Sequence, residues 1–141
     1  MIAAAITVDS YRIEAADPYP DDNEQTVARN VQEENEDARP AIANPLPDVA
    51  EYDTILLGCP VCNVQTPMVM RTFVESVDLA GKTLHPFVTF AVSGMGRVRS
   101  DYTELLADTT VTEGLAVQGE EAQQARGAVD TWLQQLGLLP A

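Results

Sequence analysis

Two cysteines three positions apart, in the motif Cys59-Pro60-Val61-Cys62, offer the most reactive chemistry in this sequence. A thiolate in such a pair can exchange disulfides or capture an electrophilic ligand. Cys59 ends an apolar run of strand length, where cysteine commonly serves as a small buried hydrophobic residue. Cys62 lies in the loop that follows and is the better candidate for reactivity. A closed zinc site needs about four ligands, and the sequence holds no second pair to complete one.

A second segment that could contact a ligand is Ser93-Gly94-Met95-Gly96, which Arg97 follows directly. Small residues allow backbone amides to come close to a ligand. The guanidinium of Arg97 could pair with a ligand carboxylate or phosphate. The alternative is a turn that merely needs small residues, with the arginine paired to a surface acid.

A continuous apolar run at residues 52–59 has the length and residue types of a strand that is covered on both faces. Residues 84–92 and 110–117 are predicted to form two further buried strands. A shorter alternation of apolar and polar residues at 11–16, ending at Asp17-Pro18, predicts one further strand near the start of the chain.

Apolar residues at helical spacing predict helices between these strands. The predicted helices are 21–37, 66–77, 98–108 and 120–136. Asp21 or Asp22 is expected to cap the first of them, and Thr66 is expected to cap the second with Pro67 at its first helical position. Residues 38–48 contain three prolines and are expected to form a connector.

The composition indicates one domain over residues 1–141 and limits its partners. With 22 acidic and 8 basic residues the formal charge is −14, which repels nucleic acid and anionic lipid and favours a basic redox partner protein or serves solubility. The sequence has no basic leader and no apolar run of membrane-spanning length, so we expect a soluble, cytoplasmic protein. The single histidine, His85, has no serine or cysteine motif to form a hydrolytic triad and is expected to be structural.

Strands that alternate with helices predict an α/β fold, a mostly parallel sheet flanked by helices. In such sheets ligands bind beyond the carboxyl ends of the strands, which is where the two segments described above fall. The predicted binding residues are Pro60, Val61, Cys62, Asn63, Val64, Gln65, Thr66, Ser93, Gly94, Met95, Gly96 and Arg97.

The order of the motifs resembles that of bacterial flavodoxin-like proteins over essentially the whole chain. The matching segments include Tyr52-Asp53-Thr54-Ile55-Leu56-Leu57-Gly58, Thr66-Pro67-Met68, Ser93-Gly94, Glu113-Gly114-Leu115 and Trp132-Leu133. The resemblance implies a three-layer sandwich with a five-stranded parallel sheet in the order 2-1-3-4-5. It also implies FMN at the strand ends and a role in electron transfer.

The sequence departs from the family at its start. The family begins with a hydrophobic strand and a Thr-Gly-Asn-Thr loop that binds the FMN phosphate, whereas residues 1–8 resemble the end of the family's first helix. We therefore expect a truncated domain that lacks the first strand and the phosphate loop. The strand at 52–59 would then present an unpaired apolar edge, which a homodimer would cover. The alternative is a monomer in which the strand at 11–16 closes the gap.

The second departure concerns the loop at residues 60–65, which lacks the aromatic side chains that stack on flavins in close relatives. FMN-type electron transfer is the function that the family implies. A tetrapyrrole such as haem or a bilin, bound at a homodimer site, is an alternative, and a flavin-dependent reductase is a further one. A carrier or binding protein is expected rather than a catalyst.

Overall fold

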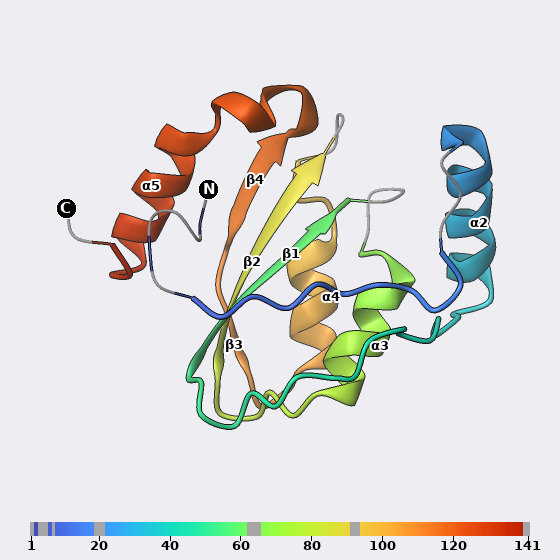
Figure 1. Ribbon diagram of the computed structural model, residues 1–141, viewed down its shortest axis with the longest axis horizontal. Helices are drawn as coiled ribbons and strands as arrows, with labels where there is room; N and C mark the ends of the chain where they lie inside the picture. Colours follow the sequence, from blue (N-terminus) through green and yellow to red (C-terminus); the bar gives the residue numbers. More distant parts are fainter. Residues whose placement is uncertain are drawn as a thin grey trace.

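The predicted buried strands form one parallel sheet in the computed structural model, which describes residues 2, 6, 8–18, 22–61, 66–90 and 94–139. β1 (Thr54–Pro60) pairs with β2 (Thr83–Phe90) along its whole length, from Thr54 opposite Thr83 to Pro60 opposite Thr89. β3 (Thr110–Val111) and β4 (Leu115–Gln118) both pair with β2, in parallel. β2 therefore lies between β1 and the β3 and β4 pair (Figure 1).

The predicted strand at 110–117 is interrupted at Gly114, which separates β3 from β4. Gly114 has a φ of 79°, a left-handed conformation that favours glycine. A Cβ atom added there would lie 2.2 Å from the carbonyl oxygen of Pro86. The two backbones approach closely here, and this approach accounts for the break between β3 and β4. In the sequence, only the glycine indicates it.

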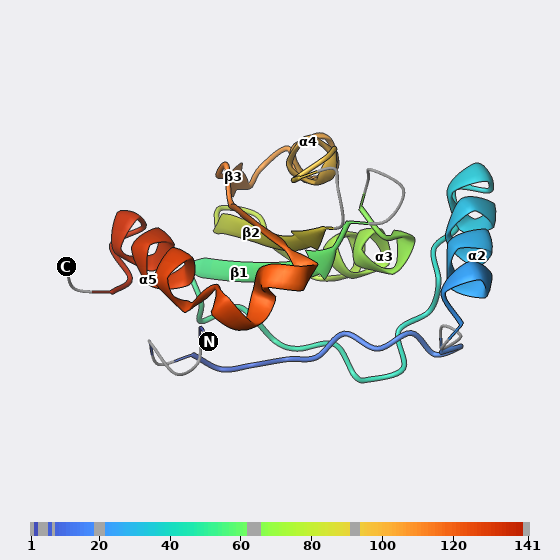
Figure 2. The same cartoon turned by 90° about the horizontal axis from the view of Figure 1, so that it is seen from above.

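Helices cover both faces of the sheet and make three layers, which confirms the predicted α/β architecture (Figure 2). On one face, α3 (Met68–Ser76) and α4 (Val98–Leu105) pack over a core that includes Leu84 and Tyr102, both without exposed surface. On the other face, α5 (Arg126–Gln135) packs Leu133 and Trp132 near Phe87. None of the helices in the described part of the chain is long and apolar enough to cross a membrane.

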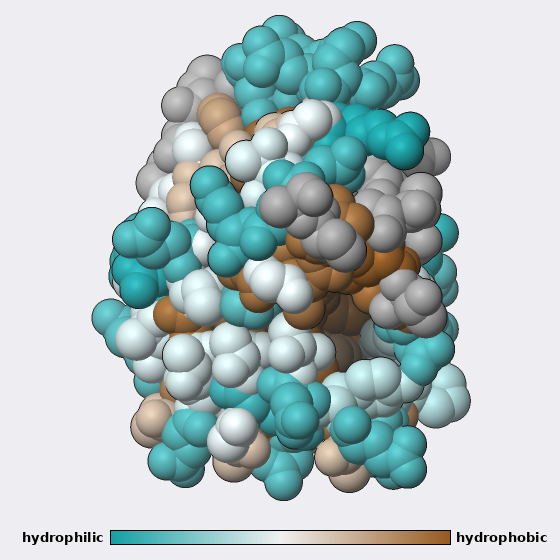
Figure 3. Space-filling model, turned by 90° about the vertical axis from the view of Figure 1, so that its left-hand side faces the viewer, coloured by the Kyte–Doolittle hydropathy of each residue, from teal (hydrophilic) through white to brown (hydrophobic). Residues whose placement is uncertain are grey.

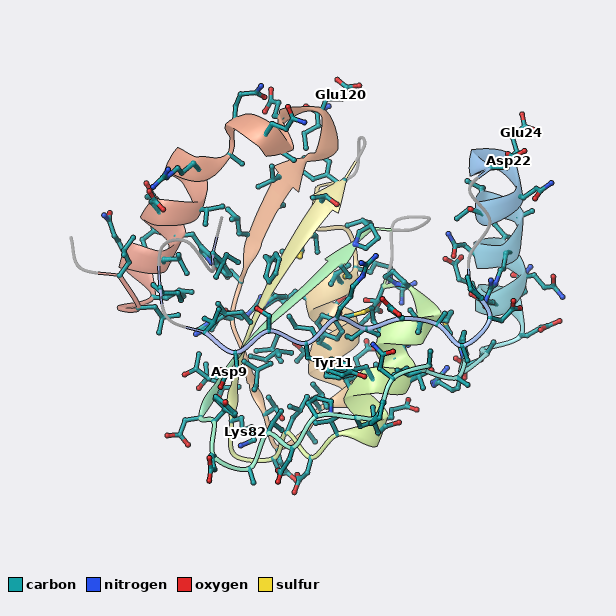
Figure 4. The ribbon with its side chains drawn as sticks, viewed as in Figure 1. Asp9, Tyr11, Asp22, Glu24, Lys82 and Glu120 are labelled. Atoms are coloured by element: carbon teal, nitrogen blue, oxygen red, sulfur yellow. The ribbon has the colours of Figure 1, made fainter. Side chains whose placement is uncertain are left out.

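Of the two helix starts predicted from the sequence, that of α2 is confirmed and that of α3 is shifted by one residue. α2 (Asn23–Asn35) begins after Asp22, whose Oδ1 accepts a 2.8 Å hydrogen bond from the amide of Glu24, as predicted (Figure 4). α3 begins one position later than predicted: Pro67 is its N-cap residue, and Thr66, the predicted cap, makes no capping bond. Thr66 donates its amide instead to the buried carboxylate of Asp101. The last helix is preceded by a 3-10 turn, η1 (Gly119–Gln124).

The predicted strand at residues 11–16 is wrong. Only Ala15 forms a bridge, an isolated antiparallel one with Ile42. The segment 8–18 crosses in front of β1 without pairing to it (Figures 1 and 2). Residues of both line a cavity. A strand needs a partner for its backbone groups, and within the described ranges no strand lies beside β1 on that side. The segment therefore does not close the gap.

Candidate functional site

Two chain segments lie together at the carboxyl end of the sheet. The first follows β1, and the amide of Val61 donates a 2.9 Å hydrogen bond to the carbonyl oxygen of Thr89 on β2. The second follows β2 and continues through the turn 94–97 into α4. The parallel register of β1 and β2 brings these segments to one edge, as predicted. Of the predicted binding residues, Cys62, Asn63, Val64, Gln65 and Ser93 lie outside the described residues.

The turn at residues 94–97 contains two glycines in left-handed conformations. Gly94 and Gly96 have φ values of 63° and 57°, which glycine adopts at little cost. A Cβ atom added to Gly94 would meet nothing within 4 Å, so the space beside this residue is open. Met95 accepts a hydrogen bond from the amide of Val98 at 3.2 Å and joins the turn to α4.

Asp101, which the sequence analysis missed, ties the two segments together. Its carboxylate is 1% exposed and lies 3.2 Å from the Nη2 atom of Arg71 and 3.2 Å from the amide of Thr66. Arg97 approaches the same carboxylate at 3.8 Å and is itself 62% exposed. The buried carboxylate of Asp101 thus contacts Thr66 at the end of the first segment, Arg71 in helix α3 and Arg97 in the second segment. Its only signal in the sequence is the four-residue spacing from Arg97.

Two polar atoms beside this carboxylate are buried without a hydrogen-bond partner among the described residues. They are Thr66 Oγ1 and Arg71 Nε. Such groups carry a cost of about 1–3 kcal/mol each when unsatisfied. Thr66 and Arg71 therefore each keep one hydrogen-bonding atom unsatisfied within the part of the chain that the structure describes.

The cysteine and histidine singled out in the sequence are part of the core. Cys59 is buried, and its Sγ lies 3.6 Å from Tyr102 Oη, as expected for a small core residue. Burial raises the pKa of Tyr102. His85 Nδ1 lies 2.9 Å from Thr112 Oγ1, and its ring meets Trp132 edge-on. Desolvation lowers the pKa of His85, which keeps the ring neutral at pH 7. These contacts make His85 structural, as predicted.

A cavity of about 1240 Å³ lies along the edge of β1 that does not pair with β2. Its walls come from β1, from the segment 8–15 and from α3, and it reaches Pro60 at the carboxyl end of the sheet. Figure 3 shows a hollow among hydrophobic side chains on this side of the molecule. Among the described residues no strand pairs with this edge of β1, as the sequence predicted, and the edge faces a partly enclosed space. Within the described residues, no group of three potential metal ligands is present.

Comparison with known proteins agrees with this architecture. The sequence model of the family described as Flavodoxin matches residues 1–136. The structure is similar to candidate flavoproteins of Bacteroides uniformis (TM-score 0.82, 29% identity, 94% of this chain and 85% of that one) and Bacteroides eggerthii (TM-score 0.79, 26% identity, 96% and 86%). A flavoprotein of Lactobacillus acidophilus in complex with FMN shares the fold at 19% identity (TM-score 0.62, 79% and 76%). No curated protein matches the sequence.

The Asp101→Ala substitution should lower the free energy of unfolding by about 3 kcal/mol, because it leaves the guanidinium of Arg71 buried without its charge partner. Asp130→Ala is the matched control, since Asp130 forms a 3.9 Å pair with an exposed arginine, Arg126, and should cost less than about 0.5 kcal/mol. Urea denaturation of both variants measures the difference. Equal, small losses would show that Asp101 does not hold the two segments together.

Proposed function

This chain belongs to the flavodoxin family, and from that premise we propose that it binds FMN at the carboxyl ends of β1 and β2 and carries electrons. The open glycine turn at residues 94–97 is the observation that carries the proposal. The fold neighbour from Lactobacillus acidophilus, which holds FMN, supports the choice of cofactor. Bound FMN would supply one- and two-electron redox chemistry.

The described residues fit a flat, anionic cofactor in two respects. A Cβ atom added to Gly94 would meet no atom within 4 Å apart from those of its chain neighbours, which leaves room for a planar ring beside the backbone of this residue. The guanidinium of Arg97 is mostly exposed, and its nearest anion, a carboxylate oxygen of Asp101, is 3.8 Å away. Arg97 would pair with a ligand phosphate, while Asp101 would hold the arginine near the turn.

An electron carrier fits the charge of the chain better than a nucleic-acid or membrane-surface protein. The formal charge of −14 favours encounters with a basic donor or acceptor protein and raises the rate of association at low ionic strength. No contact in the described part of the structure favours haem or a bilin over FMN. A reductase that uses the same cofactor would differ from a carrier by turnover with a reduced nicotinamide.

Titration of the purified protein with FMN, followed by quenching of flavin fluorescence, tests the proposal directly. Riboflavin, haem and biliverdin are titrated in parallel under the same conditions. We expect saturable binding of FMN, tighter than that of riboflavin because only FMN offers a phosphate to Arg97. Absence of FMN binding, or tighter binding of a tetrapyrrole, would overturn the proposal.

Gly94→Val should weaken FMN binding about tenfold or more, a loss of about 1.4 kcal/mol, because its side chain fills the space in which the ring would lie. Gly81→Val is the matched control: Gly81 also has a positive φ, 77°, and open space beside it, but it precedes β2 at the opposite end of the sheet. Both variants share a backbone strain of about 1–2 kcal/mol, so thermal denaturation should give them similar melting temperatures. Equal affinity of the two variants for FMN would place the ring elsewhere.

Arg97→Glu should weaken FMN binding about tenfold and change riboflavin binding less than about twofold, because the charge acts on the phosphate alone. Arg126→Glu makes the same charge change in a similar pair, four residues before Asp130 at 3.9 Å, and lies in α5 on the other face of the sheet. It should leave both affinities within about twofold. A similar loss for both ligands in Arg97→Glu would show that Arg97 does not meet the phosphate.

A further inference from the structure

The loop that separates β3 from β4, residues 112–114, lies beside the start of α4. α4 packs next to β3 on one face of the sheet (Figure 2). Two side chains reach this loop from the region of the glycine turn: Met95, which belongs to the turn, and Arg99, which lies in the first turn of α4. The loop therefore contacts the candidate site from the outer edge of the sheet.

The first of these contacts is made by the side chain of Met95. A Cβ atom added to Gly114 would lie 3.0 Å from Met95 Cε, so the methyl group of the methionine occupies space that a side chain at position 114 would need. Met95 also packs against the core that α3 and α4 cover. Its carbonyl oxygen accepts the amide of Val98. The turn at 94–97 is therefore anchored at its second residue, both to the core and to the loop.

The second contact is a hydrogen bond from Arg99, whose Nε donates to the carbonyl oxygen of Thr112 at 3.1 Å. Within the described part of the chain the guanidinium of Arg99 makes no ion pair, although the sequence has 22 acidic residues. Arg97, the N-cap residue of α4, makes no side-chain capping bond. A helix start without a cap depends on other contacts to hold it in place. The bond from Arg99 to Thr112 supplies one such contact.

The loop itself is bonded to the centre of the sheet. The amide of Thr112 donates to the carbonyl oxygen of Leu84 at 3.0 Å, and Thr112 Oγ1 lies 2.9 Å from Nδ1 of His85. His85 is buried and meets Trp132 of α5. Thr112 thus uses its amide and its hydroxyl toward β2 and its carbonyl oxygen toward Arg99. Because β2 is the central strand of the sheet, the loop is a firm support for the start of α4.

We propose that Met95 and Arg99 are positioning residues for FMN, and that through them the loop at 112–114 fixes the turn at 94–97 against which the flavin binds. The identity of the ligand rests on the proposed function, whereas the two contacts belong to the protein alone. A turn that is already ordered loses less conformational entropy when a ligand binds, and this raises affinity. Met95, predicted from the sequence to bind the ligand, acts in this proposal by holding the backbone of the turn.

Gly114 is the point at which the loop, the turn and β2 meet. A side chain there would displace the methyl group of Met95 and would also clash with the backbone of Pro86. Substitution of Gly114 would therefore disturb the sheet and the turn together. Met95 and Arg99 are the positions at which the turn can be altered separately.

Met95→Ala removes the contact with the loop and should loosen the turn. In the protein without FMN, the backbone order parameters of Gly94 and Gly96 should fall from about 0.85 to below about 0.6. Leu105→Ala is the matched control, because Leu105 is also partly buried against the same core but lies at the far end of α4. It should leave both glycines as ordered as in the unmodified protein. Unchanged order parameters in Met95→Ala would overturn the proposal.

The same variants are then titrated with FMN. Affinity should fall about fivefold or more in Met95→Ala and stay within about twofold in Leu105→Ala and in Met95→Leu, which refills most of the space. Equal affinity of Met95→Ala and the unmodified protein would overturn the positioning role and leave the cofactor assignment intact. Absence of FMN binding by the unmodified protein would overturn the cofactor assignment, and the order parameters would still decide whether the loop holds the turn.

Arg99→Lys keeps the positive charge and removes the Nε atom that donates to Thr112. FMN affinity should fall about threefold or more, and the loss should persist at about 1 M salt, where the Debye length is about 3 Å. Arg126→Lys makes the same change in α5 and should leave affinity within about twofold. An unchanged affinity in Arg99→Lys, or a loss that disappears at high salt, would overturn the positioning role of Arg99.

Discussion

The parallel pairing of β1 with β2 over seven residues positions both the candidate site and the cavity. Because the strands run together from Thr54 to Pro60, their carboxyl ends coincide, and the segments that follow them must start side by side. The same pairing uses only one edge of β1. The other edge keeps its backbone groups unpaired among the described residues, and that edge is one wall of the 1240 Å³ cavity. The pairing of β1 with β2 therefore determines both where the candidate site lies and which edge of β1 faces the cavity.

The buried carboxylate of Asp101 is a second constraint on the candidate site, in addition to the pairing of the strands. Strand register fixes where a loop starts but not how it continues. Asp101 contributes the second constraint, since it joins Thr66, Arg71 and Arg97 through one nearly unexposed group. A buried charge is tolerated only where its partners are close and well oriented. Thr66, Arg71 and Arg97 are therefore held close to one another by a single group.

The sequence predicted the elements whose signals are local. The run at 52–59 is apolar and bounded by Gly58 and Pro60, and Asp22 is a strong helix cap, so β1 and α2 were found within a few residues. The strand predicted at 11–16 failed because alternation gives a strand only where a partner exists. Asp101 was missed because it looks like any surface acid in so acidic a chain; its burial depends on Arg71, thirty positions earlier. The turn at Gly94 was found because glycine spacing is visible in the sequence.

The break at Gly114 has a consequence for the behaviour of the protein in concentrated solution. It divides the outer edge of the sheet into strands of two and four residues, too short and too interrupted to act as a template for another molecule. At the opposite edge, the crossing segment 8–18 lies in front of β1. Long, flat edges promote intermolecular β-aggregation, and natural proteins avoid them by shortening or covering them. In this sheet the edge formed by β3 and β4 is short, and the edge of β1 is covered by the segment 8–18. Together with the high negative charge, these two features should keep the protein from aggregating into cross-β structure.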